Sequence, residues 1–415
     1  MRFRTISLLC VLFLLSSVPD LYSYSILTHE AIIDSVWKES IEPMLRERFP
    51  KVTDRELTAA RAYAYGGSIV QDVGYYPLGS KFFTDLTHYV RTGDLVASLL
   101  QDAVTLDEYA FALGALSHYD ADVNGHPAGI NRVVPMMYPG LQRKYGNTIA
   151  FEDDPAAHLN AEFSFDVLRI AGGRYAFSDY RDFIGFEVAK LLLRRSFKHT
   201  YGLDLDDAFG NFDLAVGTYR RAVSRLIPEM TEVAWEKRRD DIEKSQPGMT
   251  REKFLYKMSR AEYEMTWGIQ YDDKGLPARI AAAPGRVLPK VGPFYVLSFQ
   301  SPGPDAEKLF TESFNGAVER YRMDLAAEKS RRSQPANVNL DIGAPSDPGK
   351  YKMCDDAYAS LVDHLAKERF TDVPQDVREN ILAFYKDDSA AISTRKDRRH
   401  WAKLQQELET LKKVK

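Results

Sequence analysis

The sequence predicts an all-α protein, because apolar residues recur at helical spacing along the chain while alternating strand patterns are rare. Residues that favour helix starts precede several of these runs. The chain has 415 residues, of which 45% are hydrophobic, which is enough for one large core or two modest ones. We therefore expect a bundle of many helices.

The expected helices follow one another with short connections. Residues 27–49 begin the series, with Thr28 as the expected N-cap, and residues 54–72 begin at an aspartate. Residues 105–123 begin with a threonine followed three positions later by a glutamate, and residues 154–171 open with Asp-Pro. Further helical patterns cover residues 178–197, 211–245, 250–266, 305–330, 355–369 and 374–386.

Two segments have the composition of linkers. They are residues 244–249, "KSQPGM", and residues 332–350, which are rich in Pro, Gly, Asn and Asp. Residues 286–299 fit either an extended segment or a buried loop. We expect a main domain over residues 24–240 and a helical C-terminal region of unknown role over residues 241–415.

The N-terminus is typical of a secretory signal. Arg2 and Arg4 precede an apolar run at residues 6–15 that is short for a bilayer span, and small and helix-breaking residues follow. We expect residues 1–23 to be cleaved and the protein to be exported, the alternative being an uncleaved membrane anchor. The net charge of −4 gives no support to bulk attraction of nucleic acid.

Histidine and carboxylate residues concentrate in the first 160 residues. Two pairs, His118–Asp122 and His158–Glu162, are spaced so that both members share one helix face. A single such pair usually lies on a surface, but burying several without an ion would leave polar groups unsatisfied. Five of the eight histidines lie in this region, namely His29, His88, His118, His126 and His158. The residues alone thus predict a site for several zinc ions.

These residues resemble the zinc-dependent phospholipase C superfamily, which includes fungal single-strand-specific nucleases. Its members are all-helical, with three zinc ions at the bottom of a cleft and ligands in a fixed order. The same order is found here in His29, Asp72, His88, His118–Asp122, His126 and His158–Glu162. The resemblance covers roughly residues 24–170. It implies a phospholipase C/nuclease-like bundle with a trinuclear zinc cleft, here followed by a C-terminal helical extension.

The resemblance also implies how about three zinc ions are held. One ion is expected on Asp72, His88, His118 and Asp122. A second is expected on His126, His158 and Glu162. The third is expected on His29 and the terminal amine and carbonyl of Tyr24, with Asp122 as a bridge. Tyr24 stands where the nuclease branch has Trp, and His126 follows Asp122 by four residues where better-known relatives have six.

Residues next to the expected ligands on the helix at 105–123, and the segment that follows it, have expected roles as well. Asp120 and Asn124 are expected to orient imidazoles through hydrogen bonds. "NGHP", residues 124–127, is expected to break the helix and direct the ring of His126 separately.

The reaction that the resemblance implies is hydrolysis of a phosphodiester by a zinc-activated water, with Asp72 orienting or deprotonating the water. The substrate is expected to be a phospholipid, with peripheral contact to a membrane surface. Nucleic acid, as substrate of a nuclease of the same fold, is the alternative. A non-catalytic exported protein that binds zinc or a partner is another. Aromatic residues at 75–77, Phe82, Phe83 and Tyr89 either line the cleft or pack in the core. The oligomeric state is left open.

Overall fold

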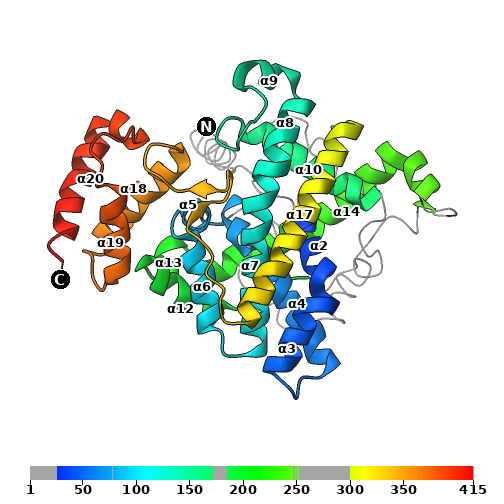
Figure 1. Cartoon of the computed structure of the whole chain (residues 1–415), viewed down its shortest axis with the longest axis horizontal. Helices are drawn as coiled ribbons and strands as arrows, with labels where there is room; N and C mark the ends of the chain where they lie inside the picture. The colour runs from blue at the N-terminus through cyan, green and yellow to red at the C-terminus, as the bar shows by residue number, and fades with distance from the viewer. Residues whose placement is uncertain are drawn as a thin grey trace, which may run out of the picture.

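The computed structural model describes residues 26–76, 78–171, 185–245, 248, 250–251 and 300–414, and helices dominate it (Figure 1). The predicted all-α fold is confirmed. The first part contains α2 (Ile26–Val36), η1 (Trp37–Ile41), α3 (Glu42–Arg48), α4 (Asp54–Ile69), η2 (Val70–Tyr75), α5 (Lys81–Tyr89), α6 (Thr92–Asp102), α7 (Leu106–Gly125), η3 (His126–Ile130), α8 (Asn131–Met137), α9 (Pro139–Tyr145) and α10 (Pro155–Ala171). The second part contains α12 (Lys190–Tyr201), α13 (Leu205–Ala208), α14 (Phe212–Ser245), α17 (Pro304–Lys329), β1 (Val338–Asn339), β2 (Ala344–Pro345), α18 (Lys352–Lys367), α19 (Gln375–Phe384), η5 (Ser393–Lys396) and α20 (Arg398–Leu411).

The first helices follow their sequence signals except at two expected caps. The N-cap of α4 is Thr53, and the aspartate expected to cap this helix, Asp54, is its first residue. The segment expected at 27–49 forms α2, the π-helical turn η1 and α3. Thr28 is wrong as an N-cap, because it lies inside α2 and donates its hydroxyl to Asp166 at 2.7 Å. Thr105 and Glu108 do form the expected capping box at the start of α7, which satisfies two backbone N–H groups there.

Helices α4 and α7 cross closely in the core of the molecule. Gly67 and Gly114 face each other's helices, so that a Cβ on Gly67 would lie 2.0 Å from the Phe111 carbonyl oxygen. A Cβ on Gly114 would lie 2.0 Å from the Ala64 carbonyl oxygen. Only glycine permits such an approach of two helix backbones. This crossing fixes α7 against the end of α4, from which the chain enters η2.

The C-terminal region packs on the same core as the N-terminal helices. Helix α17 lies along α7 (Figure 1). The Tyr321 hydroxyl donates to the Leu113 carbonyl at 2.8 Å, and Phe314 and Val318 belong to the hydrophobic cluster that contains Leu116 of α7. The domain division at residue 240 stays a prediction, but the helices on its two sides share one core.

The segment expected as a linker at residues 332–350 contains a short antiparallel hairpin instead. Val338 pairs with Pro345 and Asn339 pairs with Ala344, with a four-residue turn between the strands. Gly343 has a φ of +64° in this turn, and a Cβ there would lie 2.7 Å from the Val123 carbonyl oxygen of α7. The hairpin is therefore held against the bundle, and it leads into α18.

Several predictions from sequence lie outside the described residues. They concern the signal segment at 1–23, the terminal Tyr24, most of the helix expected at 250–266 and the segment at 286–299. In the part of the chain that the structure does describe, no helix combines the length and the apolar character needed to span a bilayer.

We predict that Gly114→Ala lowers the free energy of unfolding by about 1–3 kcal/mol, because the added methyl group would press on the backbone of α4. Gly316→Ala on α17 is the matched control, since no atom lies within 4 Å of a Cβ there. That control should gain up to about 1 kcal/mol from helix propensity. Denaturant unfolding followed by circular dichroism measures both, and equal stabilities of the two variants would contradict the close crossing.

Candidate metal centre

The centre of the candidate site lies on α7. His118 and Asp122 occupy consecutive turns of this helix and are 0% and 1% exposed. The expectation that "NGHP" breaks the helix is wrong, because α7 passes directly into the π-helical turn η3, which begins at His126. Because the helical backbone continues to residue 126, His126 lies four residues after Asp122 on the same side of the helix. The Nε2 atom of His126 lies 3.4 Å from Oδ1 of Asp122.

Four other elements bring the remaining predicted residues to α7. His29 comes from α2, Asp72 from η2, and His88 from the last turn of α5. His158 and Glu162 come from consecutive turns of α10. All of these side chains are buried. The eight predicted residues that the structure describes are therefore assembled from segments spread over more than 130 positions of the sequence.

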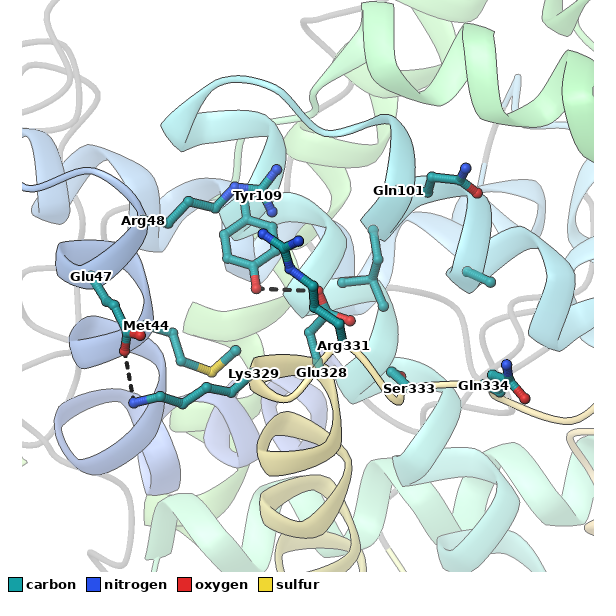
Figure 2. A pocket seen from close by; sticks show the side chains of 12 residues that line it. Met44, Glu47, Arg48, Gln101, Tyr109, Glu328, Lys329, Arg331, Ser333 and Gln334 are labelled. Atoms are coloured by element: carbon teal, nitrogen blue, oxygen red, sulfur yellow. Dashed lines mark hydrogen bonds and ion pairs between the residues drawn. The ribbon is translucent and has the colours of Figure 1, made fainter.

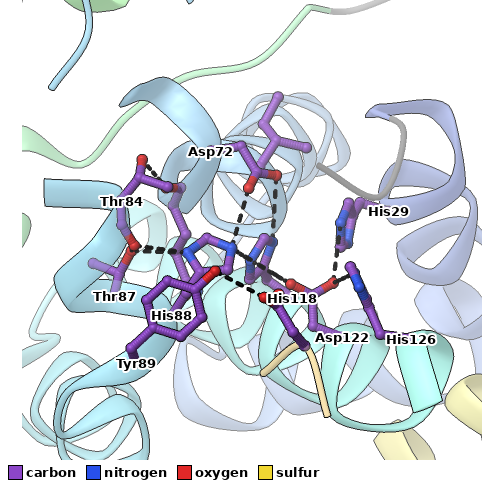
Figure 3. A network of polar contacts seen from close by, with 12 residues as sticks. His29, Asp72, Thr84, Thr87, His88, Tyr89, His118, Asp122 and His126 are labelled. Carbon is purple, nitrogen blue, oxygen red and sulfur yellow. Dashed lines mark hydrogen bonds and ion pairs between the residues drawn. The ribbon is translucent and has the colours of Figure 1, made fainter. Parts of the chain in front are cut away.

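The carboxylate of Asp122 lies between two pairs of imidazoles (Figure 3). Its Oδ1 atom is 3.5 Å from Nε2 of His29 and 3.4 Å from Nε2 of His126. Its Oδ2 atom is 3.2 Å from Nε2 of His118 and 3.5 Å from Nε2 of His88. Two atoms that share one tetrahedral zinc ion at about 2.0–2.1 Å are themselves roughly 3.3 Å apart. The spacing around Asp122 therefore fits shared cations.

Backbone carbonyls orient two of these imidazoles. Nδ1 of His88 lies 2.8 Å from the Thr84 carbonyl, and Nδ1 of His118 lies 2.9 Å from the Ser68 carbonyl. A carbonyl only accepts, so each Nδ1 carries the proton and each neutral ring presents a lone pair at Nε2. These two Nε2 atoms face each other at 3.4 Å. Two lone pairs at this distance repel, and a cation between them removes the repulsion.

A second group lies where η3 meets α10. Nδ1 of His158 is 3.0 Å from Oε1 of Glu162, and the rings of His126 and His158 stack with centroids 5.1 Å apart. Nε2 of His158 lies 2.9 Å from the side-chain oxygen of Asn131, so Nε2 carries the proton and Nδ1 is the available donor atom. His126, His158 and Glu162 thus present three ligand atoms to one point.

Burial and the neighbouring charges shift the ionisation of this group. Burial lowers the pKa of His158 to about 3, and burial raises the pKa of Glu162 well above its usual range. Burial also opposes the charge of His126, but Asp122 outweighs it and raises the pKa of His126 to about 9. Without a cation, burial therefore favours the neutral, protonated form of Glu162, which must lose its proton to bind a metal. The neutral form of His158 that burial favours is already the form that binds a metal.

The donor atoms of the site fit zinc because of their chemical type and because several of them have no hydrogen-bond partner among the described residues. Buried oxygens of Asp72, Asp122 and Glu162 have no hydrogen-bond partner among the described residues, and neither has Nδ1 of His158. Leaving such groups unsatisfied costs free energy, which coordination to an ion removes. Imidazole and carboxylate are the ligands that zinc takes when cysteine is absent. Three groups have ligand atoms within 4.8 Å of one another, namely His29–His118–Asp122, Asp72–His88–His118 and His126–His158–Glu162.

The roles expected for Asp120 and Asn124 in orienting imidazoles are wrong, and the role expected for Tyr24 stays a prediction. The side chain of Asn124 donates to the Asp120 carbonyl at 2.7 Å, and neither side chain contacts an imidazole. Asp120 instead faces α17, where Nε of Arg320 lies 3.7 Å away, because it projects from another face of α7 than His118. Tyr24 lies outside the described residues.

The groups that do orient the imidazoles are the Ser68 and Thr84 carbonyls and the Asn131 side chain. The two carbonyls have no signal in the sequence, because every residue has one. Asn131 follows η3 directly, and its proximity to His158 depends on how α8 packs against α10.

The aromatic residues near the site belong to the core. Tyr75 and Tyr76 are buried, as are Phe83 and Tyr89. The ring of Tyr75 contacts that of His88 at 6.0 Å, and Tyr76 packs on Tyr219 at 4.2 Å. The sequence left open whether these residues line the cleft or pack in the core, and the structure shows that they pack in the core.

A separate cavity of about 860 Å³ lies away from these ligands (Figure 2). None of the predicted ligands lines it. Two of its charged side chains pair with each other, since Lys329 contacts Glu47 at 2.7 Å, and the Tyr109 hydroxyl donates to Glu328 at 3.3 Å. The guanidinium of Arg48 stacks on the Tyr109 ring at 4.0 Å. The cavity is therefore distinct from the residues for which the sequence predicts catalytic chemistry.

Comparison with known proteins agrees with this geometry. Residues 28–210 match the family model described as zinc dependent phospholipase C. Neither the curated proteins nor the solved structures contain a significant match to the chain. The matched segment includes His29 through Glu162, and so all eight of the ligand candidates that the structure describes. Residues 28–210, somewhat less than half of the chain, are therefore similar to the zinc-dependent phospholipase C family.

Proposed function

We propose that the chain is an exported enzyme that hydrolyses phospholipids with about three zinc ions. The match of residues 28–210 to the family model supports a hydrolase of the phospholipase C type. The observation that carries the proposal is the set of three buried groups of imidazole and carboxylate atoms around Asp122. A non-catalytic binding protein has no evident need for three such groups at one place.

The proposed ligand assignment is supported by the distances between the described candidates. Asp72 and His88 would hold one ion together with His118 and Asp122, and His126, His158 and Glu162 would hold a second. His29 and the terminal amine of Tyr24 would hold the third, with Asp122 shared between ions. The distances around Asp122 support the bridging role, because its two oxygens face different imidazole pairs.

When bound, zinc ions lower the pKa of water towards neutrality and neutralise the charge of a phosphoryl group. The role of the chain's own residues is to orient the reactants and to accept a proton. Oδ1 of Asp72 lies 3.3 Å from Nε2 of His88 and has no hydrogen-bond partner among the described residues. We propose that this carboxylate orients the attacking water and accepts its proton.

The burial of the aromatic residues supports a phospholipid substrate over single-stranded nucleic acid. Stacking of bases needs exposed aromatic faces near the site, and Tyr75, Tyr76 and Tyr89 are all covered. Six residues after Asp72, the side chain of Leu78 is 56% exposed. We propose that Leu78 contacts the apolar part of a lipid surface when the substrate is bound.

Export rests on the sequence of the N-terminus. We propose that residues 1–23 direct the chain across a membrane and are then removed, so that Tyr24 becomes the terminal residue. The positive charges of Arg2 and Arg4 and the apolar run at residues 6–15 support this proposal.

We predict that His118→Ala and Glu162→Ala each lower both the zinc content and the rate. Each variant removes a ligand from a different group, so each should lose about one zinc ion per chain and at least about 100-fold in rate. Zinc per chain is measured by elemental analysis, and the rate on phosphatidylcholine vesicles and on single-stranded DNA.

His199→Ala is the matched control, because His199 is exposed and its Nδ1 atom lies 2.9 Å from Asp102, away from the ligand candidates. Full zinc content in both site variants would contradict the ligand assignment. Cleavage of DNA without cleavage of lipid would replace the phospholipase by the nuclease, and zinc binding without either activity would favour a binding protein.

We expect Asp72→Asn to lower the rate by about 10²–10⁴-fold, since an amide does not accept the proton that a carboxylate accepts. The His126–His158–Glu162 group does not include Asp72 and should keep its zinc. The measurement is the rate at saturating zinc together with the zinc content. A variant that retains the wild-type rate would exclude Asp72 as the base.

Leu78→Glu is expected to reduce the rate on vesicles by about tenfold, which corresponds to the loss of roughly 1.4 kcal/mol of apolar contact. Its rate on a soluble, short-chain phosphodiester should not change. Leu191→Glu is the control, because Leu191 is 71% exposed on α12. Equal effects of the two substitutions on vesicle hydrolysis would show that Leu78 has no special contact with lipid.

A further inference from the structure

The turn of the C-terminal hairpin lies against the elements that carry the metal ligands, although it is outside the segment that matches the family. We call residues 340–343 the hairpin turn. The N–H of Leu340 donates to the carbonyl of His88 at 3.1 Å. His88 lies in the last turn of α5, where carbonyls have no partner within the helix, so this bond fixes the end of α5.

The carboxylate of Asp341 continues the contact. Its Oδ2 atom accepts hydrogen bonds from the hydroxyls of Tyr89 at 2.8 Å and Tyr351 at 2.6 Å, and Asp341 is 3% exposed. Tyr89 is the residue after His88. The Tyr351 hydroxyl also accepts from the N–H of Glu152 at 3.2 Å, in the connection that leads into α10. One buried carboxylate thus ties α5 to the segment ahead of His158.

The backbone of Asp341 acts on the second metal group. Its carbonyl accepts from the side-chain amide of Asn131 at 2.7 Å. This bond fixes the amide so that the Asn131 oxygen faces Nε2 of His158 at 2.9 Å. The orientation of Asn131 sets the proton of His158 on Nε2 and leaves Nδ1 directed towards Glu162. The hairpin turn therefore contacts two of the metal groups. It bonds directly to the backbone of His88, and it contacts His158 through the side chain of Asn131.

We propose that Asp341 is a positioning residue of the zinc site, and that the C-terminal region completes the site by fixing the orientation of His88 and His158. The proposal rests on the proposed function for the presence of zinc. Groups that orient metal-binding imidazoles typically change metal affinity by about 10–100-fold when they are removed. None of the contacts of Asp341 requires a ligand bond to the metal itself.

The test compares Asp341→Asn with Asp355→Asn in the full mature chain. Asp355 is an equally buried carboxylate of the C-terminal region, and it accepts from the N–H groups of Gly349 and Ser393 at 2.8 and 2.6 Å. It contacts none of the metal-ligand elements through these bonds. The control therefore reports what the loss of a buried carboxylate does to the C-terminal region alone.

Zinc affinity is measured by competition with a chromogenic chelator, and the visible spectrum of the cobalt-loaded protein reports the ligand geometry. We expect Asp341→Asn to bind zinc about 10–100-fold more weakly and to change the cobalt spectrum. Asp355→Asn should lower the unfolding temperature without either effect. Wild-type affinity and spectrum in Asp341→Asn would overturn the proposal, as would an equal loss of affinity in Asp355→Asn.

A milder pair of substitutions serves if Asp341→Asn does not fold. Tyr351→Phe removes one of the two hydroxyls that bind Asp341 and keeps the ring. Its control is Tyr358→Phe, which removes a hydroxyl that donates to Asn380 at 3.0 Å. We expect weaker zinc binding in the first and not in the second, and the reverse result would overturn the proposal. Because these readouts need no substrate, an inactive wild type that binds zinc would refute the proposed function and leave this comparison decisive.

Discussion

The carboxylate of Asp122 is the interaction on which the rest of the site depends. It is completely buried, accepts no hydrogen bond among the described residues, and faces four imidazoles at 3.2–3.5 Å. A protein core tolerates such an arrangement only when cations balance it. The close crossing of α4 and α7 contributes to this arrangement, because α7 carries Asp122 and the carbonyl that orients His118 lies on α4. The glycines at the crossing thus allow the approach of the two helices that this hydrogen bond spans.

Residues of the C-terminal region contact the candidate site, so the site extends beyond the segment that matches the family model. The family match ends at residue 210, yet hydrogen bonds that hold the site in place come from residues 340 and 341. Helix α17 packs along α7 on the same hydrophobic cluster. The polar segment before α18 is therefore better described as part of the wall of the site than as a tether between two units.

The helices and the ligand positions could be predicted from sequence to a large extent, and the details of orientation could not. Helical spacing of apolar residues gave α7 and α10, and the spacing of four residues gave the pairs on each of them. The π turn at His126 could not be predicted, because Gly-His-Pro is also the composition of a helix end. The hairpin was missed because strands of two residues produce no alternating pattern. Contacts such as Asn131 with His158 depend on tertiary packing that no local pattern encodes.

The bond between Tyr89 and Asp341 joins residues that are 252 positions apart. Contacts at such separation form late, because ordering so long a loop costs entropy before the contact gives any return. The ribosome synthesises the N-terminal helices long before the hairpin that contacts the end of α5. The candidate metal site can therefore reach its described arrangement only after residue 341 has been synthesised, long after its last ligand candidate at residue 162.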